Sequence, residues 1–370
     1  MKTAIKKSDF VLTPYMKSDN LKGTWQVLNT VIPYLLLWVL AFKVADISVL
    51  LLPPIIILMV LFSARSFSLM HDCGHYSLFN SKKVNRTVGF LLGIINAIPQ
   101  YAWSRGHAYH HKHNGDWEMY RGPVAILSVD QFAALTPAQQ WKYEFIRQPL
   151  MLLPGGFFYL IIKPRLALIL GTIGLVKHII AGLKEDYKVG LPAIIATYKS
   201  RNWYTKGEFW DLLFNNICVV GSWIYLSNLL GAGFFWSVYS IVMTFSAAVF
   251  ICVFFVQHNF EGSYAHKSKG WDYLSGAVYG SSYLKLPAIL NWFTADIGYH
   301  NIHHLSERIP NYNLQACHQA NSHLLTESKV LTIGDISDCY KFLLWDADGS
   351  GLQSIESFHA QTSPVINAPG

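Results

Sequence analysis

The chain has 370 residues, of which 52% are hydrophobic and 14% are charged, whereas an average soluble chain carries about 25% charged residues. This balance argues against a soluble protein and indicates long segments that face lipid. The formal net charge is +7, but no basic run is interleaved with aromatic residues, so we expect no nucleic-acid partner and interpret the charge as the cytoplasmic excess of a membrane protein.

Four apolar runs approach the roughly 20 residues that a membrane-spanning helix needs. Pro53 and Pro54 stand inside the second run and are expected to kink it. The links between the first and second runs and between the third and fourth are very short, so the runs are expected to form two helical hairpins. The predicted spans cover residues 27–44, 47–64, 211–230 and 234–256.

Two further apolar segments, 88–103 and 150–183, are predicted to lie at the membrane interface. The first is too short for a span. The second is interrupted by prolines, glycines and basic residues, so it is interpreted as membrane-associated helices near the interface. The interrupting residues are Pro154, Gly155, Gly156, Lys163, Pro164 and Arg165.

Basic residues are concentrated in the segments that precede the apolar runs, and the short hairpin links contain almost none. Residues 1–26 carry five lysines, and 102–148 and 184–206 each carry five basic residues. Because positively charged loops stay on the cytoplasmic side of a membrane, both termini and the long polar segments are predicted to be cytoplasmic. The five cysteines are scattered and unpaired in spacing, which fits a reducing compartment.

The predicted organisation is a cytoplasmic N-terminal segment (1–26), a membrane domain (27–344) and a C-terminal tail (345–370) that frays from Thr362. The chain is therefore predicted to be an all-α integral membrane protein with four transmembrane helices, interfacial helices and a cytoplasmic histidine-rich domain.

Eight of the 15 histidines fall in three short clusters, HDCGH, HAYHH and HNIHH. Spacings of three and four residues place side chains on one face of a helix, so each cluster is expected to aim several imidazoles at one point. All three clusters follow predicted membrane segments and are expected on the cytoplasmic side. His258, in QHNFE at the end of the last run, is a candidate ninth ligand. The clustered residues are His71, His75, His107, His110, His111, His300, His303 and His304.

All-imidazole ligation suits zinc, copper, iron or nickel. Eight or nine histidines exceed the four ligands of one zinc ion, so the clusters predict a dinuclear centre that binds O2. The chain has no dinucleotide, flavin or haem motif, so the electrons are expected to come from a separate protein. Asp72, Glu261 and Asp296, the last one helical turn before His300, are candidate hydrogen-bond partners of the imidazoles.

Trp103 and Arg105 stand beside the second cluster, HAYHH. They are interpreted as interfacial anchors, with the entrance for a lipid headgroup as the alternative role. His113, near the same cluster, is out of register with its ligand face.

The sequence resembles the membrane fatty acid desaturase family, from about the first hairpin to Leu344. The clusters look like that family's three histidine boxes. The segments GYHNIHHLSERIPNYNLQACH and VQHNFEGSYAHKSKGWDYLSGAVYGSSYLKLP read like the bacterial acyl-lipid desaturases of the Δ12 (omega-6) and Δ5 type. The animal acyl-CoA branch has an Asn four residues before the histidine that matches His258, and here that position is Phe254.

The resemblance implies a di-iron centre that uses O2 to place a cis double bond in the acyl chain of a membrane lipid or an acyl thioester. It implies a ferredoxin or a cytochrome b5-like protein as electron donor, and an enzyme embedded in the inner (cytoplasmic) membrane. The implied iron ligands are His71, His75, His107, His110, His111, His258, His300, His303 and His304.

Two alternatives remain open at this point. A di-iron hydroxylase of acyl chains or alkanes shares the histidine boxes. A metal transporter is more remote, because transporters place polar ligands within their spans, and the four predicted spans contain no histidine.

Overall fold

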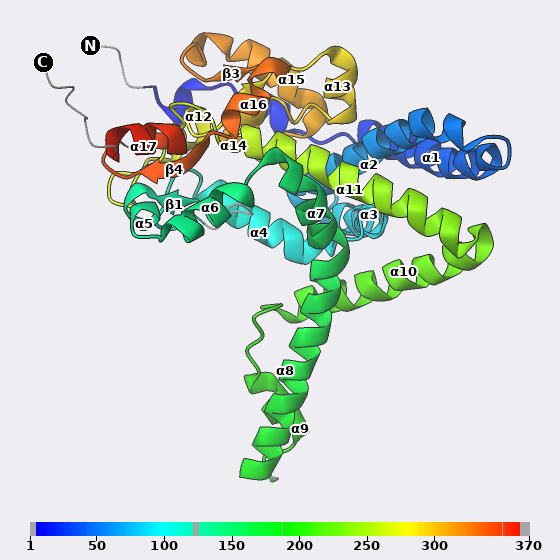
Figure 1. Ribbon diagram of the computed structural model, residues 1–370. Coiled ribbons are helices and arrows are strands. Elements are labelled where there is room, and N and C mark those ends of the chain that lie inside the picture. The colour runs from blue at the N-terminus through cyan, green and yellow to red at the C-terminus, as the bar shows by residue number, and fades with distance from the viewer. Residues whose placement is uncertain (1–4, 121–125, 187, 350, 363–370) are drawn as a thin grey trace, which may run out of the picture.

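The computed structural model describes residues 5–120, 126–186, 188–349 and 351–362. Helices dominate the described chain (Figure 1). The longer helices are α1 (Asn20–Ala45), α2 (Leu52–Gly74), α3 (Lys82–Ile95), α4 (Gln100–Lys112), α8 (Lys163–Glu185), α10 (Lys206–Leu230), α11 (Ala232–Val256) and α15 (Asn311–Ala320). The shorter helices are α5 (Val129–Ala133), α6 (Pro137–Phe145), α7 (Leu152–Phe157), α9 (Leu191–Thr197), α12 (Tyr273–Val278), α13 (Ala288–Phe293), α14 (His300–Leu305), α16 (Ile336–Cys339) and α17 (Ile355–Thr362).

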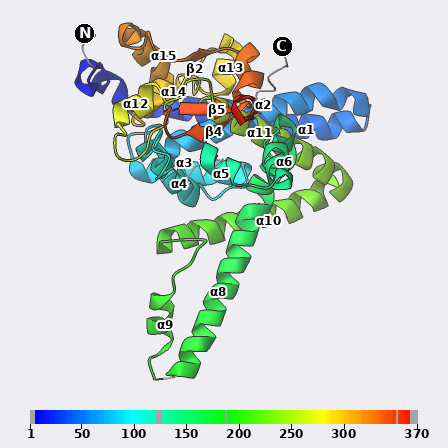
Figure 2. The same cartoon turned by 60° about the vertical axis from the view of Figure 1, so that its left-hand side comes forward.

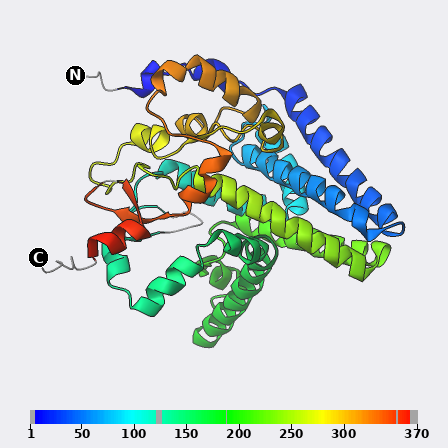
Figure 3. The same cartoon turned by 45° about the horizontal axis from the view of Figure 1, so that its top comes forward.

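The described residues contain five helical stretches that are long and apolar enough to cross a membrane. Four of them coincide with the predicted runs and form two hairpins, α1 with α2 and α10 with α11, which pack together through α2 and α11 (Figure 3). The fifth is the stretch that was predicted to be interfacial. The stretches are Asn20–Ala45, Val49–Gly74, Pro149–Glu185, Lys206–Leu230 and Ala232–Val256.

The predicted kink at Pro53 and Pro54 is wrong. A short 3-10 turn, Val49–Leu51, precedes α2, and both prolines stand in the first turn of α2. A proline in the first turn removes only an amide hydrogen that has no partner within the helix. The prolines therefore mark the start of α2, and the helix continues beyond the predicted end of the run, to Gly74 at the first histidine box.

The fifth stretch continues through the prolines and glycines that were expected to interrupt it. It comprises α7, a π-helical turn at Phe158–Ile162, and α8, with Pro164 in the first turn of α8. The Arg165 guanidinium ties this stretch to the site region. It donates hydrogen bonds to the Ala97 carbonyl, between α3 and α4, at 2.8 Å and to Asn215 of α10 at 3.2 Å.

Helices α8 and α9 project from the remainder of the molecule as an arm that runs crosswise to the two hairpins (Figures 1 and 2). On one face of α8, glycines allow the returning segment to pack closely, with Trp203 against Gly171 and Ile194 against Gly182. The other face is a stripe of exposed apolar side chains. That stripe comprises Leu166, Ile169, Leu170, Ile173, Val176, Ile180 and Leu183.

Short strands in the polar half of the molecule were not predicted from the sequence. One sheet has the order β1-β4-β5, with β1 parallel to β4 and β4 antiparallel to β5, and a second pairs β2 with β3 in parallel. Strands of two residues are too short to show an alternating pattern, and their partners lie far away in the sequence. The strands are β1 (Leu127–Ser128), β2 (Tyr283–Leu284), β3 (Val330–Leu331), β4 (Phe342–Asp346) and β5 (Gly351–Ser354).

The segment predicted as a C-terminal tail is part of the fold as far as it is described. It contains the end of β4, then β5 and α17, and the ring of Phe358 on α17 lies 5.2 Å from the ring of Phe132 on α5. Fraying was predicted from Thr362 onward; Thr362 is the last residue of α17, and residues 363–370 lie outside the described residues.

The arm provides a test of this packing. Replacing Gly171 with Val would drive a methyl-bearing side chain into the Trp203 ring, and overpacking of this kind costs about 1–3 kcal/mol. We expect the 191–203 segment to detach from α8 in Gly171→Val, so that trypsin cleaves after Lys199 and Arg201 several-fold faster in membranes. Gly221→Val is the matched control, because an added Cβ at Gly221 on α10 meets no described atom within 4 Å. Equal cleavage rates in the two variants would contradict this packing.

Candidate metal centre

The nine histidines selected from the sequence converge into two groups at the ends of the helical hairpins. Within each group the ligand nitrogens lie within 4.8 Å of one another. The groups are adjacent, since the rings of His111 and His304, one from each group, stack with centroids 4.1 Å apart. The five-histidine group comprises His71, His75, His107, His111 and His303, and the four-histidine group comprises His110, His258, His300 and His304.

Each H-x-x-H-H box is divided between the two groups rather than aimed at one point as predicted. On α4, His107 and His111 belong to the five-histidine group and His110 to the four-histidine group. On α14 the division is reversed, because His300 and His304 belong to the four-histidine group. On a helix, the side chain at i+4 is rotated by about 40° from that at i, and the side chain at i+3 by about 60° in the opposite direction. The first and third histidines of a box therefore point to one group, and the second points to its neighbour.

The first box lies where α2 ends and α4 approaches it closely. His71 is on the last turn of α2, and His75 is its C-cap residue. A Cβ at Gly74 would lie 2.8 Å from the Ser104 Cβ of α4. The glycine of HDCGH therefore permits the helix contact that brings the first and second boxes together.

The nitrogen geometry fits metal ions. The Nε2 atoms of His300 and His304 are 3.1 Å apart, and those of His107 and His111 are 3.0 Å apart. Imidazole nitrogens bind a metal ion at about 2.1 Å, and two such ligands at nearly right angles are about 3.0 Å apart. The buried Nε2 atoms of His71 and His75 have no hydrogen-bond partner in the described chain. Buried polar atoms of this kind are costly unless something binds them.

Burial keeps the imidazoles in the form that binds metal. Burial, followed by repulsion from neighbouring imidazoles, holds the pKa values of His107 and five other histidines well below the usual value of 6.5. Burial also lowers the pKa of His258 to about 4, although the Gly280 carbonyl opposes this shift. These imidazoles are therefore neutral at pH 7, as metal ligands must be. The other five are His110, His111, His300, His303 and His304.

Asp72 holds His71 in place and is itself held by the third-box region. The Asp72 carboxylate accepts from His71 Nδ1 at 3.1 Å through one oxygen and from the backbone and side-chain amides of Asn311 at 2.8 and 2.9 Å through the other. Gln26 of α1 donates to the Asn311 side chain at 2.7 Å. The chain of contacts from α1 through α15 to Asp72 therefore fixes the direction of the His71 ring.

Glu307 is the carboxylate that the sequence reasoning missed. It follows α14 and lies 3.2 Å from His75 Nδ1. The hydrogen bond with His75 and, more weakly, the charge of Lys7 hold the pKa of Glu307 below its usual value, although burial opposes them. Glu307 is four residues after His303, but its contact is with the first box, and no local spacing signals that pairing.

The structure places the other two candidate carboxylates elsewhere. Glu261 is exposed, and no hydrogen bond joins it to an imidazole in the described chain. Asp296 lies near Arg65, and burial raises the pKa of Asp296 to about 6. Ala295 and Asp296 have φ angles of 50° and 54°, and α14 begins only at His300. The assumption that Asp296 lies one helical turn before His300 on a continuous helix therefore fails.

Aromatic rings from α2, α4 and α11 cover one side of the histidines. Phe254, on the last turn of α11, has its ring 5.5 Å from His71 and 5.6 Å from His300, so it contacts both groups. Phe67 lies beside Phe254 at 6.1 Å, and Trp103 stacks on His107 at 4.8 Å. These three rings form an apolar wall beside the imidazoles.

The remaining candidates lie outside both groups. Arg105 pairs with Glu208 at 2.6 Å rather than with an imidazole. His178 contacts the Thr197 hydroxyl at 2.9 Å. Within the described ranges, no histidine outside the nine belongs to either group; the six others are His113, His178, His266, His318, His323 and His359.

Metal content tests the two groups directly. The purified chain is expected to hold two metal ions. His300→Ala removes one of the four donors of its group, so we expect about one ion per chain by inductively coupled plasma mass spectrometry. The control is His323→Ala, because His323 is exposed and belongs to neither group. An unchanged metal content in His300→Ala, or a loss in His323→Ala, would contradict the arrangement.

Comparison with known proteins identifies the family of this chain. A family model described as fatty acid desaturase matches residues 47–334, which is 288 of the 370 residues. A fatty acid desaturase of Bacillus subtilis (strain 168) is 28% identical over 346 residues, which cover 93% of this chain and 89% of the relative.

Two more distant relatives carry the name of an electron donor. The sn-1 acyl-lipid omega-3 desaturase (ferredoxin) of Nostoc sp. (strain 36) is 24% identical over 67% of this chain and 61% of its own length. The acyl-lipid omega-3 desaturase (cytochrome b5), endoplasmic reticulum, of Arabidopsis thaliana is 24% identical over 70% of this chain and 60% of its own length. The family match over most of the chain confirms the resemblance seen in the histidine boxes, and the chain belongs to the fatty acid desaturase family.

Proposed function

We propose that this enzyme is an O2-dependent fatty acyl desaturase that introduces a cis double bond, with two iron ions held by the nine histidines. The observation that carries the proposal is the pair of adjacent, buried, all-imidazole groups at the ends of two apolar hairpins. One group would hold one ion with five donors, and the other would hold the second ion with four. Bound iron supplies the oxidising power that an unactivated C–H bond requires, which no side-chain acid or base provides.

The protein's own residues would orient the reactants and exclude water. The neutral imidazoles present lone pairs at two fixed points, and Asp72 and Glu307 fix two of the rings. The apolar wall of Phe254, Phe67 and Trp103 is the natural surface for acyl methylenes, because Phe254 contacts imidazoles of both groups. A chain lying against Phe254 would place adjacent methylenes near both metal positions, and positioning of this kind contributes much of a catalytic effect.

We propose four membrane spans, α1, α2, α10 and α11, with the boxes and both termini on the cytoplasmic side of the inner membrane. The second box precedes the Pro149–Glu185 stretch and the third follows α11, yet their histidines lie in the same two groups. The number of crossings between these boxes must therefore be even. Because α10 and α11 already give two crossings, a crossing by α8 would make three.

The arm of α8 and α9 would then lie along the cytoplasmic surface of the membrane. Its crosswise direction and its stripe of exposed apolar side chains support this placement (Figure 2). A helix of this kind buries its apolar face at the boundary between headgroups and acyl chains.

The proposed substrate is the acyl chain of a membrane lipid, with an acyl thioester as the alternative carrier. Apolar spans around the site favour a substrate that is already in the bilayer. The proposed electron donor is a separate ferredoxin or cytochrome b5-like protein, in line with the printed names of the Nostoc and Arabidopsis relatives.

Product analysis tests the reaction. We expect a new olefin, seen by gas chromatography–mass spectrometry of derivatised fatty acids, when the chain is expressed with a donor in a bacterium that lacks polyunsaturated fatty acids. His303→Ala should abolish the product, because His303 belongs to the five-histidine group, while His323→Ala should retain it. A hydroxy acid without an olefin would instead identify a hydroxylase, and a purified wild type without iron would contradict the di-iron centre.

Cysteine labelling tests the four-span topology. Asp46→Cys, between α1 and α2, and Lys188→Cys, at the far end of the arm, are placed singly in a variant without the five native cysteines. In intact cells a membrane-impermeant maleimide is expected to label Asp46→Cys, and to label Lys188→Cys only after permeabilisation. Labelling of Lys188→Cys in intact cells would mean that α8 crosses the membrane.

A further inference from the structure

The two histidine groups differ in how their Nδ1 atoms are held. In the five-histidine group, carboxylates accept from His71, through Asp72 at 3.1 Å, and from His75, through Glu307 at 3.2 Å. In the four-histidine group, His258 donates to the Gly280 carbonyl at 2.9 Å. The buried Nδ1 atoms of that group's other members, His110, His300 and His304, have no partner in the part of the chain that is described. The same is true of His111 and His303 in the five-histidine group, so the two groups differ in the carboxylates that hold His71 and His75.

A carboxylate changes the imidazole that it holds. It fixes the tautomer in which Nε2 carries the lone pair, it fixes the ring direction, and it raises the basicity of the ligand. A backbone carbonyl carries no net charge and has a weaker effect of the same kind. The metal in the five-histidine group would therefore meet one donor more than the metal in the four-histidine group, and two of its donors, His71 and His75, would be made more basic by a carboxylate.

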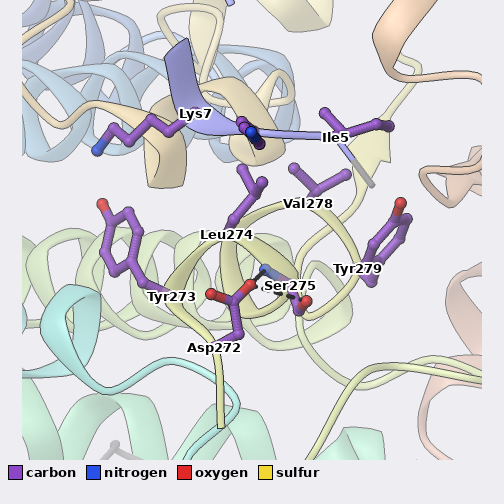
Figure 4. A pocket seen from close by; sticks show the side chains of 9 residues that line it. Ile5, Lys7, Asp272, Tyr273, Leu274, Ser275, Val278 and Tyr279 are labelled. Atoms are coloured by element: carbon purple, nitrogen blue, oxygen red, sulfur yellow. Dashed lines mark hydrogen bonds between the residues drawn. The ribbon is translucent and has the colours of Figure 1, made fainter. Parts of the chain in front are cut away.

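The N-terminal segment places a positive charge, that of Lys7, near Glu307. Lys7 lies over the ring of Tyr273 at 4.5 Å, and its charge acts on Glu307. The Tyr273 hydroxyl donates to the His304 carbonyl at 2.7 Å, which ties α12 to α14. Figure 4 shows Lys7 and Tyr273 at the edge of a cavity of about 610 Å³ between the N-terminal segment and α12. No histidine is among the described residues that line this cavity, and Lys7 and Tyr273 reach the histidine groups indirectly, through Glu307 and α14.

We propose that Glu307 is a positioning residue that, with Asp72, makes the five-histidine group the tighter and more electron-rich of the two metal sites. This inference rests on the proposed di-iron function. The iron in the four-histidine group is then released first, and it is the iron that is more easily reduced. Partners of this kind typically change metal affinity by about 10–100-fold.

Glu307 is better suited to a test than Asp72. The Glu307 side chain is 43% exposed, whereas that of Asp72 is 2% exposed and also holds Asn311. Glu307→Gln keeps the size and an acceptor oxygen but removes the charge. Glu261→Gln is the matched control, because Glu261 is an exposed glutamate with no described contact to an imidazole.

The experiment follows iron release from the purified, iron-loaded enzyme to a chelator in excess. The wild type is expected to lose its two irons in two phases, and His300→Ala identifies the fast phase, which disappears, as the four-histidine group. In Glu307→Gln the slow phase should become about 10–100-fold faster while the fast phase is unchanged. In Mössbauer spectra of ⁵⁷Fe-loaded enzyme, Glu307→Gln should shift one of two doublets. Glu261→Gln should change neither readout.

The unchanged fast phase reports that the Glu307→Gln variant is folded. A slow phase equal to that of Glu261→Gln, a single phase in the wild type, or equal acceleration of both phases would overturn the role of Glu307. A wild type that binds no iron would overturn the proposed function itself, and the metal content measured before the chelator is added separates this outcome from the others.

Discussion

The structure depends on the gathering of nine imidazoles around two neighbouring points. Polar nitrogens without partners are costly in a buried place, and the Nε2 atoms of His71 and His75 have none in the described chain. Metal ions would offset that cost, but only if all the donors are held at the right distance. The rest of the fold meets this constraint. The hairpins place the C-terminal ends of α2 and α11 close together. The histidines of α4 and α14 pack against those ends.

Buried polar contacts keep these segments in register. Arg65 on α2 donates to Thr30 of α1 at 3.0 Å and to the Trp292 carbonyl of α13, and its guanidinium lies 3.9 Å from the Trp292 ring. The chain that leads into the third box is thereby fixed to the helix that carries the first. Arg165 connects α8, α10 and the turn before α4 in the same way. Both arginines stand in apolar stretches of the sequence. The hydrogen bonds to their acceptors offset the free-energy cost of burying the guanidinium charge.

The two metal groups are built unequally, and the inequality follows from where the boxes meet the rest of the chain. The five-histidine group contains the first box, which lies against α15 and the segment after α14, and these regions supply Asn311 and Glu307. The four-histidine group lies against Gly280 and the end of α11, where a backbone carbonyl is the partner of His258. Two ions in such surroundings would differ in affinity and in ease of reduction, which suits the proposed reaction, in which a separate protein supplies the electrons.

The sequence by itself determined the four apolar helices, the eight clustered histidines with His258 as a candidate ninth, and the family, because helix period, hydropathy and short motifs are local properties. It also identified Asp72, which adjoins His71. Only the tertiary structure decided that each H-x-x-H-H box serves two groups, that Glu307 rather than Glu261 holds an imidazole, and that Pro53 and Pro54 begin a helix. The same is true of the sheet pairing between Leu127 and Leu344. Some of these features join residues that are far apart in the chain, and others depend on where a helix starts. The spacing of neighbouring residues predicts neither long-range contacts nor helix starts.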